Sequence, residues 1–483
     1  MTAAQPPLSQ PWVLFAALPL VVWLVDAAPG HAFLTGWAVA FGYFTTGLYW
    51  IGHAFLVDAA RFAWMMPFAV TILPAFLGLF WGAAFWAAAR RWTSPWTRVL
   101  VLAGWLTLIE YARAKVLTGF PWALPAYAWT ETPVAQALAW IGPFGLTLAT
   151  LALAALPAIG LAGRGVGGRI AAAVALSLLA GLWLAGAERL AKPPPAAPDA
   201  PVLRVVQPNA TQKLKWHPDW APVFYRRLLD ESAAPASPSL GPPDAVIWPE
   251  TAVPFLPAEA PERLAEIAAA GQGAPVILGA LHRQAPGGRL SNSLMVLADG
   301  AISARYDKHH LVPFGEYLPY PWLFAPLGFE KLVPGAGFDP GPGPRVLEAP
   351  GLPPFSALVC YEMIFPDEVV PDSARPAWLL QVTNDAWFGA WGGPQQHLAQ
   401  ARARAIEQGL PVVRAANTGV SAHIDAHGRL LQTLGLDRHG RLDFRLAAPL
   451  PPTPYVRMGD WPALVLALVL GVFPLSRRIV TVE

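Results

Sequence analysis

Three segments of the chain each place a side chain that could do chemistry at the end of a predicted strand. Glu250 closes "DAVIWPE", Lys308 lies in "RYDKHHLVPFGEYLP", and Cys360 closes "FSALVC". Such short apolar runs are typical of buried strands, and α/β folds gather reactive groups where strands end. A cysteine can attack a carbonyl carbon, a glutamate can take its proton, and a lysine can stabilise the resulting oxyanion. Together, these residue types suit acyl transfer through a covalent intermediate.

Each of these residues also has a plainer interpretation. Cys360 is the only cysteine among 483 residues, so the chain can form no internal disulfide and no Cys-x-x-Cys metal knuckle. Unpaired cysteines most often pack as small hydrophobic side chains. Glu250 could be the first-turn acid of a helix, and Lys308 could be a solvated surface lysine. Taken singly, none of the three residues excludes these alternatives.

The surroundings of Cys360 predict a turn from a strand into a helix. "FSALV" reads as a buried strand, and "PDEVVPD" after Cys360 reads as the beginning of a helix. The positive end of a helix dipole lowers the pKa of a thiol, and free N–H groups at that end can bind an oxyanion. We therefore expect a site that favours the thiolate.

The neighbouring histidines, His309 and His310, raise the question of a metal. Adjacent residues on a strand point to opposite faces of the sheet, and no third ligand has a suitable spacing. The sequence therefore predicts no metal site, and no cofactor is expected.

These side chains must be positioned by an α/β domain of about 250 residues. A domain of this length is large enough to bury its own core. Two adjacent strands within 292–306 lack a helix between them, which predicts a mixed sheet. Helical patterns cover 261–270 and 395–408. The strands are predicted in "VLRVVQ", "DAVIWP", "PVILGAL", "NSLMVLA", "FSALVCY", "AWLLQVT", "PVVRAAN" and "SAHIDA".

The composition places the rest of the chain in a membrane. The sequence is 55% hydrophobic and 13% charged, with a mean hydropathy of +0.41, which is too apolar for a soluble protein of this length. The net charge of +2 comes with scattered Lys and Arg residues, so no nucleic-acid partner is expected.

Apolar runs long enough to cross a bilayer fill the first 190 residues and return once near the C-terminus. The predicted spans are 11–28, 33–56, 63–89, 97–114, 134–162, 169–187 and 460–476. The predicted domains are a membrane domain at 1–190, a proline-rich linker at 191–201, the catalytic domain at 202–448, and a last span with a short tail at 449–483.

The distribution of basic residues predicts the orientation of these spans. With the N-terminus outside, the inner loops hold the larger number of Lys and Arg residues, as cytoplasmic loops usually do. This places the catalytic domain outside the cytoplasm. The inner set is Arg90, Arg91, Arg98, Arg164, Arg169, Arg477 and Arg478, against Arg61, Arg113, Lys115, Arg189 and Lys192 outside.

Two charged residues lie within a predicted span. Glu110 and Arg113 are spaced i,i+3, which permits a salt bridge on one helix face. We expect the pair to anchor the helix beneath the "GFPW" loop, and the alternative is a grip on a phospholipid headgroup.

The order of the motifs "IWPETAVP", "DKHHLVPFGEYLP" and "LVCYEMIFP" resembles the nitrilase, or carbon-nitrogen hydrolase, superfamily and its Glu-Lys-Cys triad. Further segments make the whole chain similar to the apolipoprotein N-acyltransferase family. These are the six preceding spans, "LTGFPWALPAYAW", "NATQKLKW", "TNDAWFG", "GPQQH" and "GDWP" before the last span.

This resemblance implies a nitrilase-like αββα sandwich inserted between polytopic transmembrane helices, on the periplasmic face of a bacterial inner membrane. It implies that Cys360 takes a fatty acyl chain from a phospholipid, typically phosphatidylethanolamine, as a thioester. The acyl chain then passes to the N-terminal amine of a diacylated apolipoprotein in a ping-pong scheme. The triad falls on Glu250, Lys308 and Cys360.

Four more positions match the family's active site. Glu316 matches a second glutamate, and Glu362 matches a further supporting acid. Trp216 and Tyr361 match aromatic positions near the substrate-binding cavity, although Tyr361 also fits core packing. Family members commonly carry one more N-terminal span. Its loss would put the N-terminus outside, in agreement with ten initial residues free of Lys and Arg, and a misassigned start codon is the other explanation.

Two competing functions follow from the same residues. A membrane-tethered amidase would use the same triad on a soluble amide with water as acceptor, but it would need no six-span base. A transporter with an outer accessory domain would need polar groups along its spans, and these are sparse.

Overall fold

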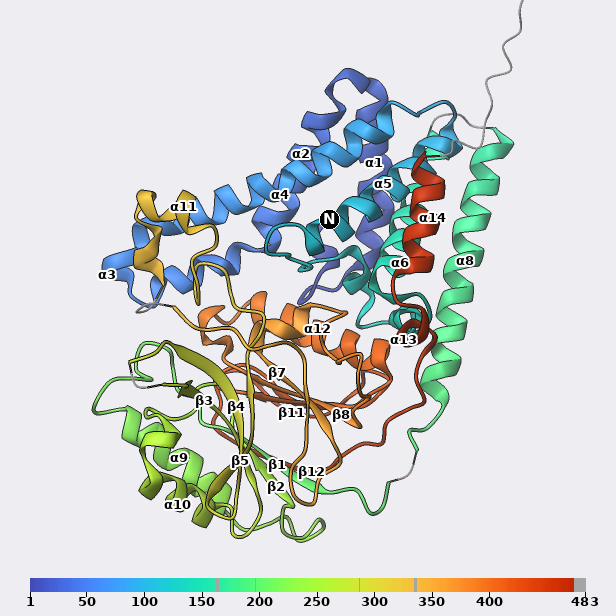
Figure 1. The fold of residues 1–483 in the computed structure, drawn as a ribbon. Coiled ribbons are helices and arrows are strands. Elements are labelled where there is room, and N and C mark those ends of the chain that lie inside the picture. Colours follow the sequence, from blue (N-terminus) through green and yellow to red (C-terminus); the bar gives the residue numbers. More distant parts are fainter. Residues whose placement is uncertain (162–164, 196, 286, 334–336, 473–483) are drawn as a thin grey trace, which may run out of the picture.

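The computed structural model describes residues 1–161, 165–195, 197–285, 287–333 and 337–472, and it has two parts stacked on one another (Figure 1). One part is a bundle of helices, and the other is a pair of β-sheets with helices outside them. The last helix of the chain returns to the bundle after the sheets (Figure 1).

The helical part contains both long apolar helices and short turns. The C-terminal α14 (Trp461–Val472) packs on α5 (Pro95–Lys115) where a side chain on Gly104 would lie 2.5 Å from the carbonyl oxygen of Ala467, so small residues let the two backbones approach. The other helices are α1 (Leu14–Ala27), α2 (Ala32–Gly47), α3 (Ala59–Phe62), α4 (Met66–Ala89), α6 (Leu138–Ala155), α7 (Pro157–Leu161), α8 (Val166–Ala191) and α13 (Pro454–Met458).

Three helical stretches of the described chain are long and apolar enough to cross a membrane: Ala59–Ala89, Pro133–Leu161 and Val166–Ala191. The pair Pro11–Ala27 and Pro29–Gly47 also qualifies as one bent unit, with an angle of 110°. Helices occupy all seven predicted positions, but α5 carries four charged residues, and α2 ends at Gly47 before a 3-10 helix at Tyr49–Leu56. Residues 473–476 of the last predicted span lie outside the described residues. The number of spans stays a prediction.

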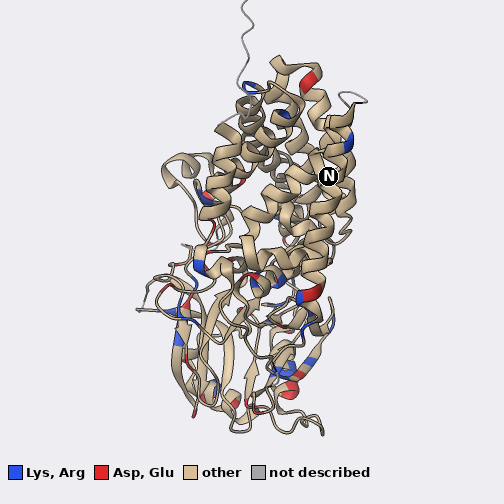
Figure 2. Cartoon of the chain, turned by 90° about the vertical axis from the view of Figure 1, so that its right-hand side faces the viewer, with Lys and Arg blue, Asp and Glu red and all other residues tan. Residues whose placement is uncertain are grey.

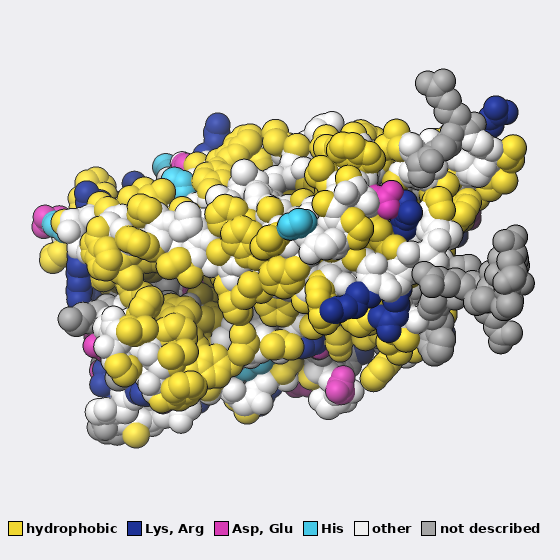
Figure 3. All heavy atoms as spheres, turned by 90° about the horizontal axis from the view of Figure 1, so that it is seen from above, with side chains coloured by type: hydrophobic (Ala, Val, Ile, Leu, Met, Phe, Trp, Pro, Cys, Tyr) yellow, Lys and Arg dark blue, Asp and Glu magenta, His cyan; other side chains and the backbone are white. Residues whose placement is uncertain are grey.

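The surface of the helical part is apolar in the way that a lipid environment requires. Charged residues gather in the sandwich and at the ends of helices, and the body of the bundle is nearly free of them (Figure 2). The end remote from the sheets is covered mainly by hydrophobic side chains (Figure 3). Large side chains such as Leu176, Leu184 and Ile72 are more than 60% exposed, which would be costly in water. The chain is therefore a membrane protein.

The part that contains Glu250, Lys308 and Cys360 is an αββα sandwich, as the family resemblance implied. One sheet has the order β12-β1-β2-β3-β4-β5 and the other β11-β10-β9-β8-β7-β6. Apolar side chains from both sheets, among them Val205, Ile247 and Ala357, form the core between them. Helices α9 (Ala221–Ala233) and α10 (Pro261–Ala270) cover the first sheet, and α12 (Gly393–Gln408) covers the second.

The eight predicted strands are present within a residue or two of their expected bounds, and β3, β4 and β5 pair antiparallel in an otherwise partly parallel sheet. The expected helix after Cys360 is absent. In its place, a 3-10 helix covers Cys360–Ile364. The strands are β1 (Val202–Gln207), β2 (Ala245–Ile247), β3 (Val276–Arg283), β4 (Leu290–Ala298), β5 (Ala301–Asp307), β6 (Val346–Leu347), β7 (Phe355–Val359), β8 (Trp378–Thr383), β9 (Val412–Ala416), β10 (Ser421–Ile424), β11 (Leu430–Leu434) and β12 (Gly440–Arg445).

Helix α12 lies between the second sheet and the helical part, where it contacts α6 (Figure 1). The buried side chain of Gln396 on this helix makes four hydrogen bonds to the helical part. Its Oε1 accepts from the indole N–H groups of Trp50 and Trp122, at 3.1 and 2.7 Å. Its Nε2 donates to the carbonyl oxygens of Pro6 and Gly47, at 3.2 and 3.1 Å. The two parts of the molecule are therefore joined by buried hydrogen bonds at their interface.

The charged pair on α5 anchors the loop that follows this helix. Arg113 forms a salt bridge with Glu110 and donates to the carbonyl oxygens of Phe120 and Trp122. Trp81 donates to the Glu110 carboxylate at 2.6 Å. Both charged side chains are almost fully buried in protein. These contacts support the anchoring interpretation of the pair.

Candidate active site

Cys360 follows the last residue of β7 at a strained turn. Its φ of 52° lies in the left-handed region, which a non-glycine residue adopts only when its surroundings hold it there. The carbonyl oxygen of Cys360 accepts from Gln381 Nε2 and lies next to His397 Nε2, with each nitrogen at 3.1 Å. His397 is oriented in turn by Asp385, 3.0 Å from its Nδ1. This buried network fixes the backbone that presents the thiol.

The expectation of a helix-stabilised thiolate is wrong. The five residues Cys360–Ile364 are too short to supply a helix dipole, and they are 3-10 in form. Burial raises the pKa of the Cys360 thiol, the negative charge of Glu250 raises it further, and Lys308 opposes both. The thiol is therefore protonated at rest and needs a base to activate it.

Glu250, Lys308 and Glu316 form one buried charged cluster with Asn292. The Nζ atom of Lys308 lies 2.8 Å from Glu316 Oε2 and 4.0 Å from Glu250 Oε1. Asn292 Nδ2 donates to Glu250 at 2.7 Å and to Glu316 at 3.1 Å, so it bridges the two carboxylates. Glu250 follows β2 in a turn and not in a helix, which contradicts its interpretation as a first-turn acid.

Burial favours the neutral forms of Glu250 and Lys308, whereas the opposite charges within the cluster favour their charged forms. Burial raises the pKa of Glu250, and the charge of Glu316 adds to this while Lys308 opposes it. For Lys308, burial disfavours the ammonium, but the charges of Glu316 and Glu250 outweigh it and raise the pKa above its ordinary value. Lys308, only 1% exposed, is a fixed cation and not a surface lysine. Glu250 is the group placed to exchange a proton.

Glu362 is fully buried and joins the Cys360 turn to the segment after Lys308. Its Oε2 accepts from the N–H of Val359 at 2.6 Å, and its Oε1 accepts from the N–H of His309 at 2.8 Å and from the hydroxyl of Tyr306 at 2.6 Å. Burial opposes its charge, but its hydrogen bonds to His309, Tyr306 and Val359 prevail and lower its pKa. Glu362 is thus a carboxylate that holds two active-site segments together.

The two aromatic candidates lie in different surroundings. Tyr361 is buried, packs against His310 and Phe365, and directs its hydroxyl at the carbonyl oxygen of Gly119 in the helical part. Trp216 is 46% exposed, and its ring faces the ammonium of Lys215. The structure thus brings Tyr361 to the interface of the two parts and connects Trp216 to the site through Lys215.

Three residues near the site were missed by the reasoning from sequence: Asn292, Lys215 and His397. Lys215 is buried, and its Nζ donates to the carbonyl oxygen of Glu250 at 3.2 Å and to Thr251 at 2.8 Å. Burial lowers the pKa of Lys215 to about 8. The sequence did offer a hint of each residue. Asn292 is a polar residue in the predicted strand "NSLMVLA", and Lys215 and His397 belong to the motifs "NATQKLKW" and "GPQQH".

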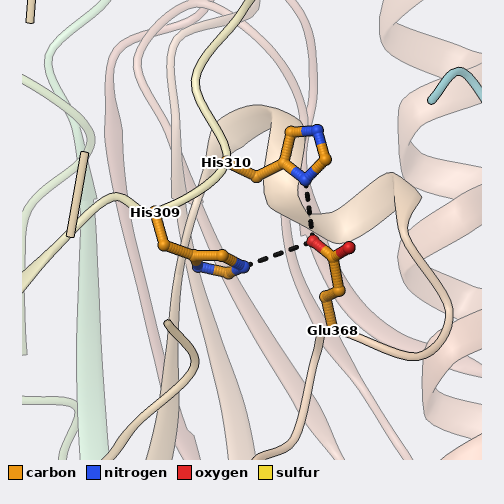
Figure 4. A group of neighbouring side chains, drawn as sticks. All are labelled: His309, His310 and Glu368. Atoms are coloured by element: carbon orange, nitrogen blue, oxygen red, sulfur yellow. Dashed lines mark hydrogen bonds and ion pairs between the residues drawn. The ribbon is translucent and has the colours of Figure 1, made fainter. Parts of the chain in front are cut away.

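His309 and His310 do not lie on a strand, contrary to the prediction. Strand β5 ends at Asp307, so His309 and His310 follow the strand and need not point to opposite faces. Both rings turn toward Glu368 (Figure 4). Glu368 thus places a carboxylate oxygen beside both rings, although it lies far away in the sequence.

Comparison with known proteins assigns the chain to a family. Residues 1–156 match the model described as the apolipoprotein N-acyltransferase N-terminal domain, and residues 228–443 match the carbon-nitrogen hydrolase model. The second match contains Glu250, Lys308 and Cys360.

Relatives match the chain over nearly its full length. A protein of Rhodopseudomonas palustris named apolipoprotein N-acyltransferase is 44% identical over 488 residues, which cover 96% of this chain and 91% of the relative. One of the same name from Bradyrhizobium diazoefficiens is 44% identical, with coverages of 97% and 91%. Another from Brucella melitensis is 38% identical, with coverages of 99% and 94%. Identity at this level across both parts shows that the chain belongs to the apolipoprotein N-acyltransferase family.

Proposed function

We propose that the chain transfers a fatty acyl group from a phospholipid to the N-terminal amine of a diacylated apolipoprotein, through a thioester on Cys360. The observation that supports this best is the position of the thiol. Cys360 is buried beside a base and a fixed cation, and the next residue, Tyr361, contacts a loop of the membrane part. A lipid donor can approach such a thiol from the bilayer.

The residues of the cluster divide the reaction into two steps. In the first, Glu250 takes the thiol proton, the sulfur attacks the ester carbonyl, and the lysophospholipid leaves as an alcohol that receives this proton. In the second, the amine of the apolipoprotein attacks the thioester and loses a proton to Glu250, which returns it to the thiolate as the amide forms. Lys308 stabilises the negative oxygen of each tetrahedral intermediate.

The other candidates have supporting roles in this scheme. Glu316 holds Lys308, and Glu362 holds the backbone on both sides of the site. Trp216 and Tyr361 would line the path of the substrates. We assign the chain to a bacterial inner membrane with the sandwich on the periplasmic face, because the predicted inner loops, including the junction of α4 and α5 with Arg90, Arg91 and Arg98, hold the larger number of basic residues.

A mass measurement tests this proposal. The purified full chain, incubated with phosphatidylethanolamine and no acceptor, should gain the mass of one acyl chain on the peptide that contains Cys360. Hydroxylamine should remove the adduct, because it cleaves thioesters. Absence of any adduct would contradict the two-step scheme. The alternative, an amidase that uses water as acceptor, is not favoured by the relatives; it would give no adduct from phospholipid but would hydrolyse small amides.

The rate of thioester formation should fall at acid pH, because Glu250 must be ionised to accept the thiol proton. Burial raises the pKa of this carboxyl above its ordinary value, so the rate should be full above that raised pKa and should drop about tenfold per pH unit below it. Quenched-flow measurement of the adduct gives this profile. Replacing Asn292 with leucine removes a hydrogen bond that lowers the pKa of Glu250, so the fall should begin at higher pH in Asn292→Leu. An identical profile for both proteins would show that Glu250 does not govern the step.

Reporter fusions test the orientation in cells. A reporter that works only in the periplasm should be active when it is joined at Pro195, just after α8. A reporter that works only in the cytoplasm should be active when it is joined after Arg478. This outcome follows from the excess of basic residues on the inner side. The reverse pattern would overturn both the orientation and the assigned compartment.

A further inference from the structure

A cluster of His309, His310 and Glu368 lies beside the active site and has no part in the proposed reaction. His310 Nδ1 is 2.7 Å and His309 Nε2 is 3.3 Å from the same carboxylate oxygen, Glu368 Oε2 (Figure 4). The side chains are 12%, 21% and 28% exposed, in chain order, so the cluster is largely buried but open to solvent on one side. One carboxylate oxygen thus lies within hydrogen-bonding distance of a nitrogen of each imidazole ring.

The other nitrogen of each ring is already committed to a hydrogen-bond acceptor. His309 Nδ1 lies 2.7 Å from Glu362 Oε1 and 2.7 Å from the hydroxyl oxygen of Tyr306, which itself donates to Glu362. His310 Nε2 lies 3.2 Å from the carbonyl oxygen of Thr118. In each ring this nitrogen must therefore carry the N–H, and in a neutral ring the nitrogen facing Glu368 then has a lone pair directed at a carboxylate oxygen.

Two lone pairs and a carboxylate that converge on one point can share one bound cation, and the alternative is a proton on each ring. Metal-binding histidines have the same pattern, since their second nitrogen donates to a carboxylate or a backbone carbonyl, which fixes the tautomer and the ring. We propose that His309 Nε2, His310 Nδ1 and Glu368 Oε2 bind a divalent transition metal ion, with zinc as the best fit to two imidazoles and one carboxylate. The open side of the cluster would leave room for a water ligand.

The charges of the cluster fit such an ion. Glu362 and Glu368 supply two negative charges, and one divalent cation with two neutral imidazoles balances them. The imidazole ligands favour zinc over magnesium or calcium, which prefer oxygen atoms. A bound ion would connect the segment after Lys308 to the loop after Cys360, and it would do so outside the reacting atoms. The ion would therefore hold the two active-site loops together, and the proposal of this metal site does not depend on the proposed function.

Metal content tests the proposal directly. The full chain, purified in detergent without a polyhistidine tag, stripped with chelator and then dialysed against zinc, should retain about one zinc per chain by elemental mass spectrometry. His310→Ala and Glu368→Gln should each weaken zinc binding in a titration by at least tenfold. The matched control is His439→Ala, an exposed histidine elsewhere in the sandwich, which should bind zinc as the parent does.

A second measurement reports directly on the ligands of the metal in the parent and in the variants. Cobalt in place of zinc should give the visible absorption bands of a low-symmetry site with nitrogen and oxygen ligands in the parent and in His439→Ala, and not in Glu368→Gln. No zinc retained by the parent, or equal binding and equal spectra in the parent and Glu368→Gln, would overturn the proposal in favour of two protonated histidines. Because the acyl adduct is measured separately, failure here leaves the proposed reaction untouched.

Discussion

Replacing Cys360 with alanine should abolish N-acylation completely, while the chain still folds and inserts into the membrane. The sulfur is the atom that bonds to the acyl chain, and no other cysteine in the sequence can replace it. Only one buried atom is removed. The turn is held by the backbone contacts of Gln381, His397 and Glu362, none of which uses the thiol.

The measurement pairs activity with stability. The variant should show no acyl adduct and no triacylated product, and its melting temperature in detergent should stay within a few degrees of the parent, because removing a single buried atom typically costs about 1 kcal/mol. Cys360→Ser is the matched control: it keeps a weaker nucleophile of similar size and should be nearly inactive with the same melting temperature. Retained triacylation by Cys360→Ala, in cells without another copy of the enzyme, would mean that the thiol is structural.

Replacing Lys308 with methionine should reduce both activity and stability. The ammonium is the cation closest to the proposed oxyanion, and the loss of one such contact typically lowers the rate by about 10²–10³. The same change deprives Glu250 and Glu316 of the cation that they share, and breaking a buried ion pair costs about 3–5 kcal/mol. Lys215 cannot substitute, since its Nζ is bound to the Glu250 carbonyl and Thr251, and its pKa is lowered to about 8.

A double variant separates these two effects. In Lys308→Met with Glu316→Gln, one of the uncompensated charges is gone, so most of the lost melting temperature should return. The activity should not return, because the oxyanion still lacks its cation. Activity is measured as the rate of adduct formation, and stability as the melting temperature. Recovery of both together would mean that Lys308 serves only to hold the fold.

The strands could be predicted from the sequence because their signals are local, whereas the αββα sandwich was implied by the family resemblance. Each strand is a short apolar run bounded by turn residues, and Glu250 and Cys360 follow directly on two of them. The residues that orient Glu250 and Lys308 were harder to find. Asn292 is one polar residue among several on β4, and only the pairing of β4 with β3 and β5 shows that it faces the carboxylates.

Two errors show where local reasoning stops. The short segment after Cys360 has the composition of a helix start, but Glu362 folds back to the N–H of Val359 and gives a single 3-10 turn. The interpretation of His309 and His310 assumed that β5 continues, whereas the backbone leaves the sheet at Asp307. In both places the buried carboxylate of Glu362 accepts a backbone N–H, from Val359 in the first segment and from His309 in the second.

The four hydrogen bonds of Gln396 also bear on how the substrates reach the thiol. A catalytic head joined to its membrane base only by a proline-rich linker could swing between a donor in the bilayer and an acceptor above it. Here the polar atoms of the Gln396 amide are bonded to Trp50, Trp122, Pro6 and Gly47, and α12 on which it sits contributes His397 to the Cys360 turn. These bonds hold the thiol at one distance from the helical part, so under the proposed function the lipid and the lipoprotein would each have to reach it there.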